Sequence, residues 1–260
     1  MRGVIARDAS GKRVEVHAQL VVGADGLNFM VVRALGSRRR VVWPSRMGLV
    51  AHLRGVNWPE DYGQMWVGRG SYIGAAPVGR ELLSVALVTD VPKRHLGSAV
   101  KILDVELRQF PPLRTRLLEG VLADRVRGIA PLAHAVSRTC GRGFLLVGDS
   151  AGFFDPFTGE GLFRALRGAE LAAEAVDRTT SGDRSALAAY QIMRQRTFGA
   201  KERLAMLIQV FVRSPGLMNY AVARLRKRPH LARQLGLVLG DLVPAETAWR
   251  AAFLWKLLGA

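Results

Sequence analysis

One stretch, Gly143–Ala169, constrains the fold of this chain more than any other part of the sequence. It begins with a continuous apolar run, Phe144–Val147, which predicts a buried strand. The pair Gly148–Asp149 ends this run, and a loop made rigid by Pro156 follows. An apolar period of three and four residues then predicts a helix over about 159–176. A carboxylate at the end of a strand, followed by a loop and a helix, is typical of ligand sites in α/β domains.

The start of this helix is suited to an electron-rich ligand. Gly159 and Gly161 stand in its first turn, where backbone N–H groups are unpaired and carry a partial positive charge. Glycines there let a ligand approach the backbone closely, while Asp149 would accept a hydrogen bond from a hydroxyl. The buried stripe of the helix is expected to consist of five apolar side chains: Leu162, Leu166, Ala169, Ala173 and Val176.

The N-terminal part predicts two further features of a sheet. Runs at 3–6 and 13–17, separated by the turn-forming Asp8–Lys12, predict a hairpin. A third run, Leu20–Val22, is continuously apolar, as in a strand covered on both faces, and stops at Gly23–Gly26.

Stretch Gly143–Ala169 resembles the second flavin motif of the FAD-dependent monooxygenase and geranylgeranyl-reductase-like superfamily, which has the para-hydroxybenzoate hydroxylase-type fold. That motif reads G-D-[AS]-A-(G/H)-x-x-x-P-x-x-G-x-G. Eight positions match it: Gly148, Asp149, Ser150, Ala151, Gly152, Pro156, Gly159 and Gly161. The resemblance implies FAD as the cofactor, with Asp149 bonded to the ribityl chain and the helix near Gly159 directed at the N1/C2=O edge of the isoalloxazine. There the helix dipole would stabilise the reduced flavin anion.

Gly23–Gly26 resembles a second motif of the superfamily, G-A-D-G-x-x-S-x-V-R, which lies near FAD and the path of the nicotinamide donor. The resemblance therefore implies NAD(P)H as the electron donor. This chain departs from the motif at two positions, because Phe29 stands at the Ser position and Val32 at the Arg position. Phe29 in place of Ser removes a hydroxyl donor and adds bulk. With both motifs, the implied cofactor-binding residues are Asp25, Gly26, Gly148, Asp149, Pro156, Gly159, Glu160, Gly161 and Leu162.

The superfamily also opens with a strand, G-x-G-x-x-G and a helix, and none of these precedes Val21. We therefore expect a mixed α/β fold with an incomplete Rossmann-like FAD-binding domain that lacks its N-terminal segment. Four strand-like runs between 46 and 88 predict an antiparallel substrate-binding sheet, and the last part of the chain has a helical period. The expected domains are the FAD-binding domain at 1–35 and 136–182, the substrate domain at 36–135, and a helical C-terminal region at 183–260.

Composition narrows the classes of partner. The chain carries 38 Lys and Arg against 21 Asp and Glu, a net charge of +17. Its densest basic runs, Arg38–Arg40 and Arg224–Arg228, are not interleaved with the aromatics used for base stacking, so we expect no nucleic-acid partner. The five His residues and the single Cys140 lack ligand spacing, so no metal site is expected. One cysteine and no apolar stretch long enough to span a bilayer favour a cytoplasmic protein.

The C-terminal helices allow two interpretations. We expect a helical cap packed on the flavin-binding domain. The alternative is a peripheral contact with the inner face of a membrane, in which basic residues at 224–228 meet anionic lipid and aromatics such as Trp249 and Trp255 enter the interface. Such a contact would suit a lipidic substrate.

The predicted function is that of an FAD-dependent oxidoreductase acting on a lipidic or aromatic small molecule, either by hydroxylation or by reduction of an isoprenoid double bond. No side chain stands out as catalytic, and neither the donor nor the oligomeric state is fixed by the sequence. Two alternatives stay open. The chain could be a non-catalytic remnant that holds no FAD, or an α/β hydrolase in which Ser150 of G-x-S-x-G is the nucleophile, with Asp183 and His230.

Overall fold

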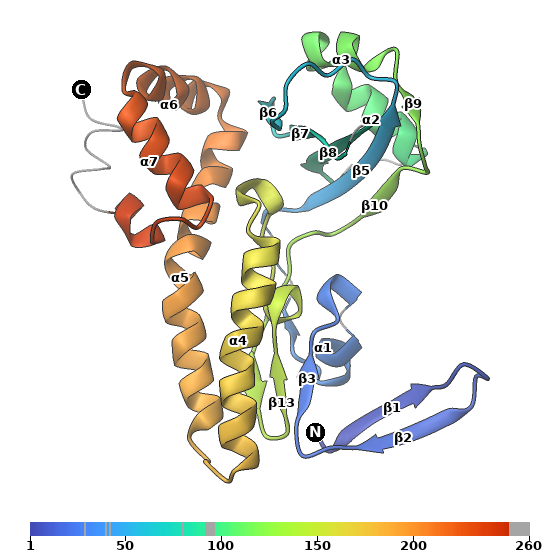
Figure 1. Ribbon diagram of the computed structural model, residues 1–260, viewed down its shortest axis with the longest axis vertical. Coiled ribbons are helices and arrows are strands. Elements are labelled where there is room, and N and C mark those ends of the chain that lie inside the picture. Colours follow the sequence, from blue (N-terminus) through green and yellow to red (C-terminus); the bar gives the residue numbers. More distant parts are fainter. Residues whose placement is uncertain (29, 40, 42, 80, 92–96, 250–260) are drawn as a thin grey trace. The chain divides into compact units, whose positions relative to one another are not determined.

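The computed structural model describes residues 1–28, 30–39, 41, 43–79, 81–91 and 97–249 (Figure 1). Within this part the chain forms two compact units. The first contains residues 1–41, 134–206 and those from 228 onward, and the second contains residues 42–133 and 207–227. The helical region after residue 183 is thus divided between both units.

A small sheet forms the centre of the first unit. β13 (Phe144–Leu146) lies between β12 (Cys140–Gly141), which is antiparallel to it, and β3 (Val21–Gly23), which is parallel. All of β13 is buried, as its apolar run predicts. The strand expected at 20–22 is also present, but its expected cover on both faces is wrong. Val21 is buried, whereas Val22 is 43% exposed among the described residues.

Helices pack on both faces of β13 and make three layers within the first unit. On one face, α1 (Met30–Ala34) contributes Val32. On the other face, α4 (Gly161–Thr180) and the first part of α5 (Ala186–Arg213) form a second cluster around Leu145. The Tyr190 hydroxyl of α5 donates to the Leu146 carbonyl at 2.5 Å. Burial raises the pKa of this phenol to about 12, so it stays a donor.

The face that α4 buries differs from the one expected. Leu162 and Leu166 are 80% and 69% exposed, and the buried positions are instead Arg164, Gly168, Leu171, Ala172 and Ala175. Small residues explain the choice. A Cβ at Gly168 would lie 3.5 Å from the Gly148 backbone nitrogen, so only a face of small side chains can approach the loop this closely.

The rest of the first unit is built from short elements. The predicted hairpin is confirmed, and the Asp8 carboxylate closes its turn by accepting from the Ser10 and Lys12 backbone N–H groups. Two further short strands pair with each other. The remaining elements are β1 (Gly3–Arg7), β2 (Arg13–His17), β4 (Arg38–Arg39), β11 (Ala135–Val136), α7 (Pro229–Leu239) and the 3-10 helix η4 (Ala245–Trp249).

The second unit is the predicted antiparallel sheet. Its strands follow the order β10-β5-β8-β7-β6, and β9 pairs with the end of β5. Alternate residues of β5, among them Leu49, Ala51 and Leu53, enter a core that α2 and α3 cover. The bounds are β5 (Arg46–Arg54), β6 (Gln64–Val67), β7 (Tyr72–Pro77), β8 (Leu82–Asp90), β9 (Val121–Leu122), β10 (Arg127–Ile129), α2 (Ala99–Leu107) and α3 (Pro111–Leu117).

The sequence sets both ends of α3. It begins at Pro111, because proline is tolerated where no intrahelical N–H bond is needed. It ends at Leu117, and Val121 and Leu122 just beyond it pair with β5.

The end of α5 and all of α6 (Pro215–Lys227) belong to the second unit. The Arg46 guanidinium is fully buried and donates to Gln209 Oε1 of α5 at 2.9 Å and to the Gly70 carbonyl. This contact ties the end of α5 to the sheet.

No helix in the described ranges is long and apolar enough to cross a membrane. Trp255 and all other residues after Trp249 lie outside the described residues.

Candidate flavin-binding site

The two motifs meet at the carboxyl ends of neighbouring parallel strands. Gly23–Gly26 follows β3 and Gly148–Asp149 follows β13. The 3-10 helices η1 (Gly26–Asn28) and η2 (Gly148–Ala151) are in contact. The structure therefore brings Asp25 and Gly26 into one neighbourhood with Gly148 and Asp149, although more than 100 residues separate them in the sequence.

Ser150 links the two motifs and is not placed as a nucleophile. Its side chain is fully buried, with Oγ 2.5 Å from the Gly23 carbonyl oxygen and 2.6 Å from that of Val147. The hydroxyl proton is therefore used by the backbone. Asp183, the expected acid, instead bonds Arg178 and Ser185. The hydrolase alternative needs an exposed serine, so this geometry does not support it.

Asp149 has the feature expected of a ligand contact. It is half-buried, and its Oδ1 atom is shielded from solvent without a hydrogen-bond partner among the described residues. Burial raises the pKa of this carboxyl, and the positive charge of Arg164 acts in the opposite direction. A buried acceptor without a donor is costly, so a ligand hydroxyl or N–H would be stabilised here.

Asp25 has one structural oxygen and one unused one. Oδ2 accepts from the Val31 backbone N–H at 3.1 Å, in the first turn of α1, while Oδ1 is buried and lacks a partner within the described part of the chain. The capping role was not anticipated from the sequence. Phe29, the departure from the motif, lies outside the described residues.

The start of α4 is open to a ligand. Gly159 has a left-handed φ of +70°, and a Cβ at Gly159 or Gly161 would meet nothing within 4 Å. Glu160 occupies the N-cap position but makes no side-chain capping bond, so the N–H groups of the first turn are left for another acceptor. A cavity of about 260 Å³ lies against this helix start, and its lining includes five predicted residues: Pro156, Gly159, Glu160, Gly161 and Leu162.

Glu160 is buried beside two cations. Its Oε1 lies 3.9 Å from Arg164 Nη1 and its Oε2 lies 4.0 Å from Lys201 Nζ. Burial raises the pKa of this carboxyl against the pull of both cations. Its side chain thus faces the interior of the protein, and the part of residue 160 that can serve a ligand is its backbone.

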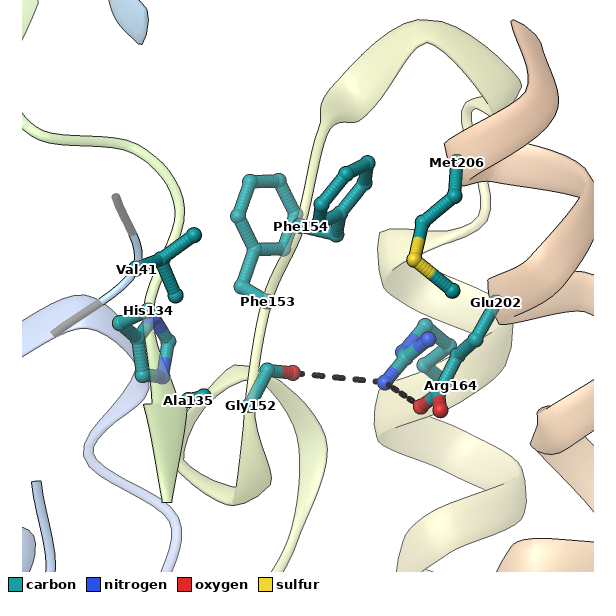
Figure 2. Close-up of a pocket in the computed structure, with 9 residues that line it drawn as sticks. All are labelled: Val41, His134, Ala135, Gly152, Phe153, Phe154, Arg164, Glu202 and Met206. Carbon is teal, nitrogen blue, oxygen red and sulfur yellow. Dashed lines mark hydrogen bonds and ion pairs between the residues drawn. The ribbon is translucent and has the colours of Figure 1, made fainter. Parts of the chain in front are cut away.

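The sequence did not single out the charged residues that lie beside the loop. A cavity of about 190 Å³ is lined by Phe153, Phe154 and Met206. In Figure 2 the two aromatic rings lie opposite Met206. At its base, Arg164 Nη2 donates to the Gly152 carbonyl at 3.3 Å and to Glu202 Oε1 at 2.9 Å (Figure 2). Arg194 holds the adjacent Ala151 carbonyl at 3.2 Å. The sequence signal for Arg164 was weak, since α4 also carries charged residues at Arg167, Glu170 and Glu174.

No group of His, Cys, Asp and Glu that could hold a metal ion occurs among the residues that the structure describes. Cys140 is a buried free thiol close to the Leu187 carbonyl oxygen, and burial raises its pKa. It is therefore a poor nucleophile at neutral pH.

Comparison with known proteins places the chain among flavoproteins. No family model matches it. It is 30% identical over 182 residues to a digeranylgeranylglycerophospholipid reductase of Methanothrix thermoacetophila, which covers 66% of this chain and 44% of the relative. It is 30% identical over 202 residues to digeranylgeranylglycerophospholipid reductase 2 of Methanopyrus kandleri, covering 74% of this chain and 50% of the relative. The chain thus spans about half the length of these curated relatives.

Solved structures show the same fold. A triple mutant of the flavin-dependent brominase Bmp2 superposes with a TM-score of 0.78 at 19% identity, over 96% of this chain and 69% of the brominase. A mutant of halogenase PltM in complex with FAD gives a TM-score of 0.70 at 16% identity, over 96% of this chain and 54% of that protein. With the two motifs and their meeting point, these findings show that the chain belongs to the flavoprotein superfamily of geranylgeranyl reductases and FAD-dependent halogenases and monooxygenases.

Proposed function

We propose that this chain binds FAD at the carboxyl ends of β3 and β13 and acts as an FAD-dependent oxidoreductase on a lipidic or aromatic small molecule. The observation that carries the proposal is the Asp149 carboxylate, a shielded acceptor without a donor, in η2, which packs against α4, the helix whose start is uncapped. The relatives' names, reductases of a geranylgeranyl lipid, favour an isoprenoid chain over an aromatic ring and reduction over hydroxylation.

The residues present fit FAD in three respects. Asp149 Oδ1 can accept from a ribityl hydroxyl, since no protein donor reaches it in the described structure. Gly159 and Gly161 leave the space that a Cβ would fill open to a flat ring. The N–H groups of the first turn of α4 would then face the electron-rich edge of that ring and stabilise negative charge there. Gly26, Gly148 and Pro156 shape the loops around these contacts.

FAD would supply the redox chemistry, and the protein would supply position and polarity. Arg164 and Arg194 hold the carbonyls of Gly152 and Ala151, and so fix the loop that carries Asp149. Phe153 and Phe154 place apolar surface beside that loop, which would exclude water from one side of the site. No described side chain is positioned as an obvious acid or base, so we assign no catalytic residue. NAD(P)H remains the proposed donor.

Asp149→Asn tests the cofactor site. The amide keeps the shape but is a weaker acceptor than a carboxylate, so we expect FAD affinity to fall by about 1–2 kcal/mol, or roughly 5- to 30-fold. The same change should stabilise the protein without FAD. Burial raises the pKa of Asp149 in the folded state, so the carboxylate opposes folding above that raised pKa, and stability recovers as the pH falls toward the ordinary carboxyl pKa.

Asp177→Asn is the matched control, because it makes the same chemical change at an exposed residue of α4, the helix that follows the Asp149 loop. It should change neither FAD affinity nor stability at neutral pH. Fluorescence titration with FAD and urea unfolding without FAD measure the two effects separately. If Asp149→Asn binds FAD as tightly as the unsubstituted protein does, Asp149 does not contact FAD.

A further inference from the structure

Helix α6 exposes apolar side chains that its own unit does not cover. Its one fully buried residue is Ala221. Leu217 and Tyr220 are 44% and 43% exposed, and Val222 on the opposite flank is 52% exposed. Residues 217, 220, 224 and 227 recur at helical spacing along one flank. This flank is apolar in its first half and basic in its second half.

The charged residues of α6 and of its neighbours in the sequence are all basic. The sequence contains no Asp or Glu between Glu202 and Asp241, and the last turns of α6 carry Arg224, Arg226 and Lys227. Other exposed helices differ. In α4, Arg167 pairs with Glu170, and in α2, Arg108 pairs with Asp104. Arg226 and Lys227 are exposed and have no such acidic neighbour on their helix.

We infer that α6 is a docking helix for the surface of a bilayer with anionic headgroups. Leu217 and Tyr220 would enter the boundary between headgroups and acyl chains, while Arg226 and Lys227 at the end of the helix would contact lipid phosphates. This inference rests on α6 alone and does not depend on FAD binding. The sequence allowed a membrane contact anywhere in the C-terminal helices, and the inference assigns that contact to α6.

A nucleic acid would satisfy the cations but not the rest of this surface. An exposed aliphatic side chain such as Leu217 gains nothing from a phosphate backbone, whereas it gains from contact with hydrocarbon. The single aromatic ring of α6, Tyr220, already has the Arg224 guanidinium 6.0 Å from its centroid. One ring does not make a series of stacking platforms.

Co-sedimentation with lipid vesicles tests the inference. We expect the protein to bind vesicles of phosphatidylcholine with one-third phosphatidylglycerol, and to bind pure phosphatidylcholine far more weakly. Arg226→Glu/Lys227→Glu should lower the partition coefficient by about 30-fold or more, since each lost basic contact weakens binding about fivefold. Leu217→Ser/Tyr220→Ser should also lower it, but the remaining binding should keep its sensitivity to salt.

Arg125→Glu/Arg138→Glu is the matched control, because it makes the same charge change at two exposed arginines outside α6. It should leave most of the vesicle binding intact, and circular dichroism should show all variants folded. The inference is overturned if the control loses as much binding as the α6 variants. It is also overturned if the protein does not bind anionic vesicles. Binding to a DNA duplex that depends on Arg226 and Lys227, without binding to anionic vesicles, would lead to the same conclusion.

Discussion

Replacing Lys201 by Met should destabilise the first unit by about 3–5 kcal/mol, the usual effect of removing one partner from a buried ion pair. Lys201 is 3% exposed. Its ammonium donates to the Val238 and Leu239 carbonyls at the end of α7, at 2.8 and 3.0 Å, and to Asp241 Oδ1 at 2.6 Å. The single cation thus satisfies helix-terminal carbonyls and a largely buried carboxylate, and joins α5 to α7.

Methionine retains the length of the side chain but cannot donate, so the carbonyls and Asp241 lose their partner together. Urea unfolding followed by circular dichroism measures the loss. Lys227→Met, on the exposed end of α6, is the control and should change the free energy of unfolding by no more than about 0.5 kcal/mol. A loss below 1 kcal/mol for Lys201→Met would show that Lys201 does not hold α7.

Replacing Arg164 by Met should have an effect of similar size on stability, about 3 kcal/mol, and should also weaken FAD binding. Arg164 is 6% exposed and lies between Glu160 and Glu202, with its guanidinium over the Phe198 ring at 5.3 Å from the centroid. Without it, two carboxylates in a partly buried cluster lose a cation, and the Gly152 carbonyl loses its donor. The loop that carries Asp149 would then be held less firmly.

Arg167→Met separates this effect from a general loss of positive charge on α4. Arg167 is one turn further along the same helix and pairs only with the exposed Glu170 in the described structure, an interaction of little energetic value. We expect it to behave like the unsubstituted protein in both unfolding and FAD titration. If Arg164→Met lowers stability but leaves FAD affinity unchanged, Arg164 acts on the core and not on the flavin loop.

The sequence predicted the strands and the helix that follows the flavin motif well. These features depend on local patterns: continuous apolar runs such as Phe144–Leu146 indicate a covered strand, and glycines mark the loops. The resemblance implied that both motifs lie near FAD, but the parallel pairing of β3 and β13, which brings Asp25 and Asp149 to one edge of the sheet, came from the structure.

The sequence predicted the buried face of α4 poorly, and the reason lies in packing between distant segments. Counting apolar spacing favoured Leu162 and Leu166, but the helix approaches η2 through Gly168, a contact that helical periodicity does not encode. The charged cluster of Arg164, Lys201 and Glu202 was also missed. Arg164 lies nearly 40 positions from the consecutive pair Lys201 and Glu202, and a charged residue ordinarily indicates a solvated face.

The most direct measurement of the central claim is a titration of the purified chain with FAD, followed by the quenching of flavin fluorescence. The proposed site predicts saturable binding of a single equivalent of FAD, weakened by Asp149→Asn and unaffected by Asp177→Asn. If the chain is folded by circular dichroism and flavin fluorescence stays unchanged at every concentration, the chain does not hold FAD by itself and the proposed cofactor site is wrong.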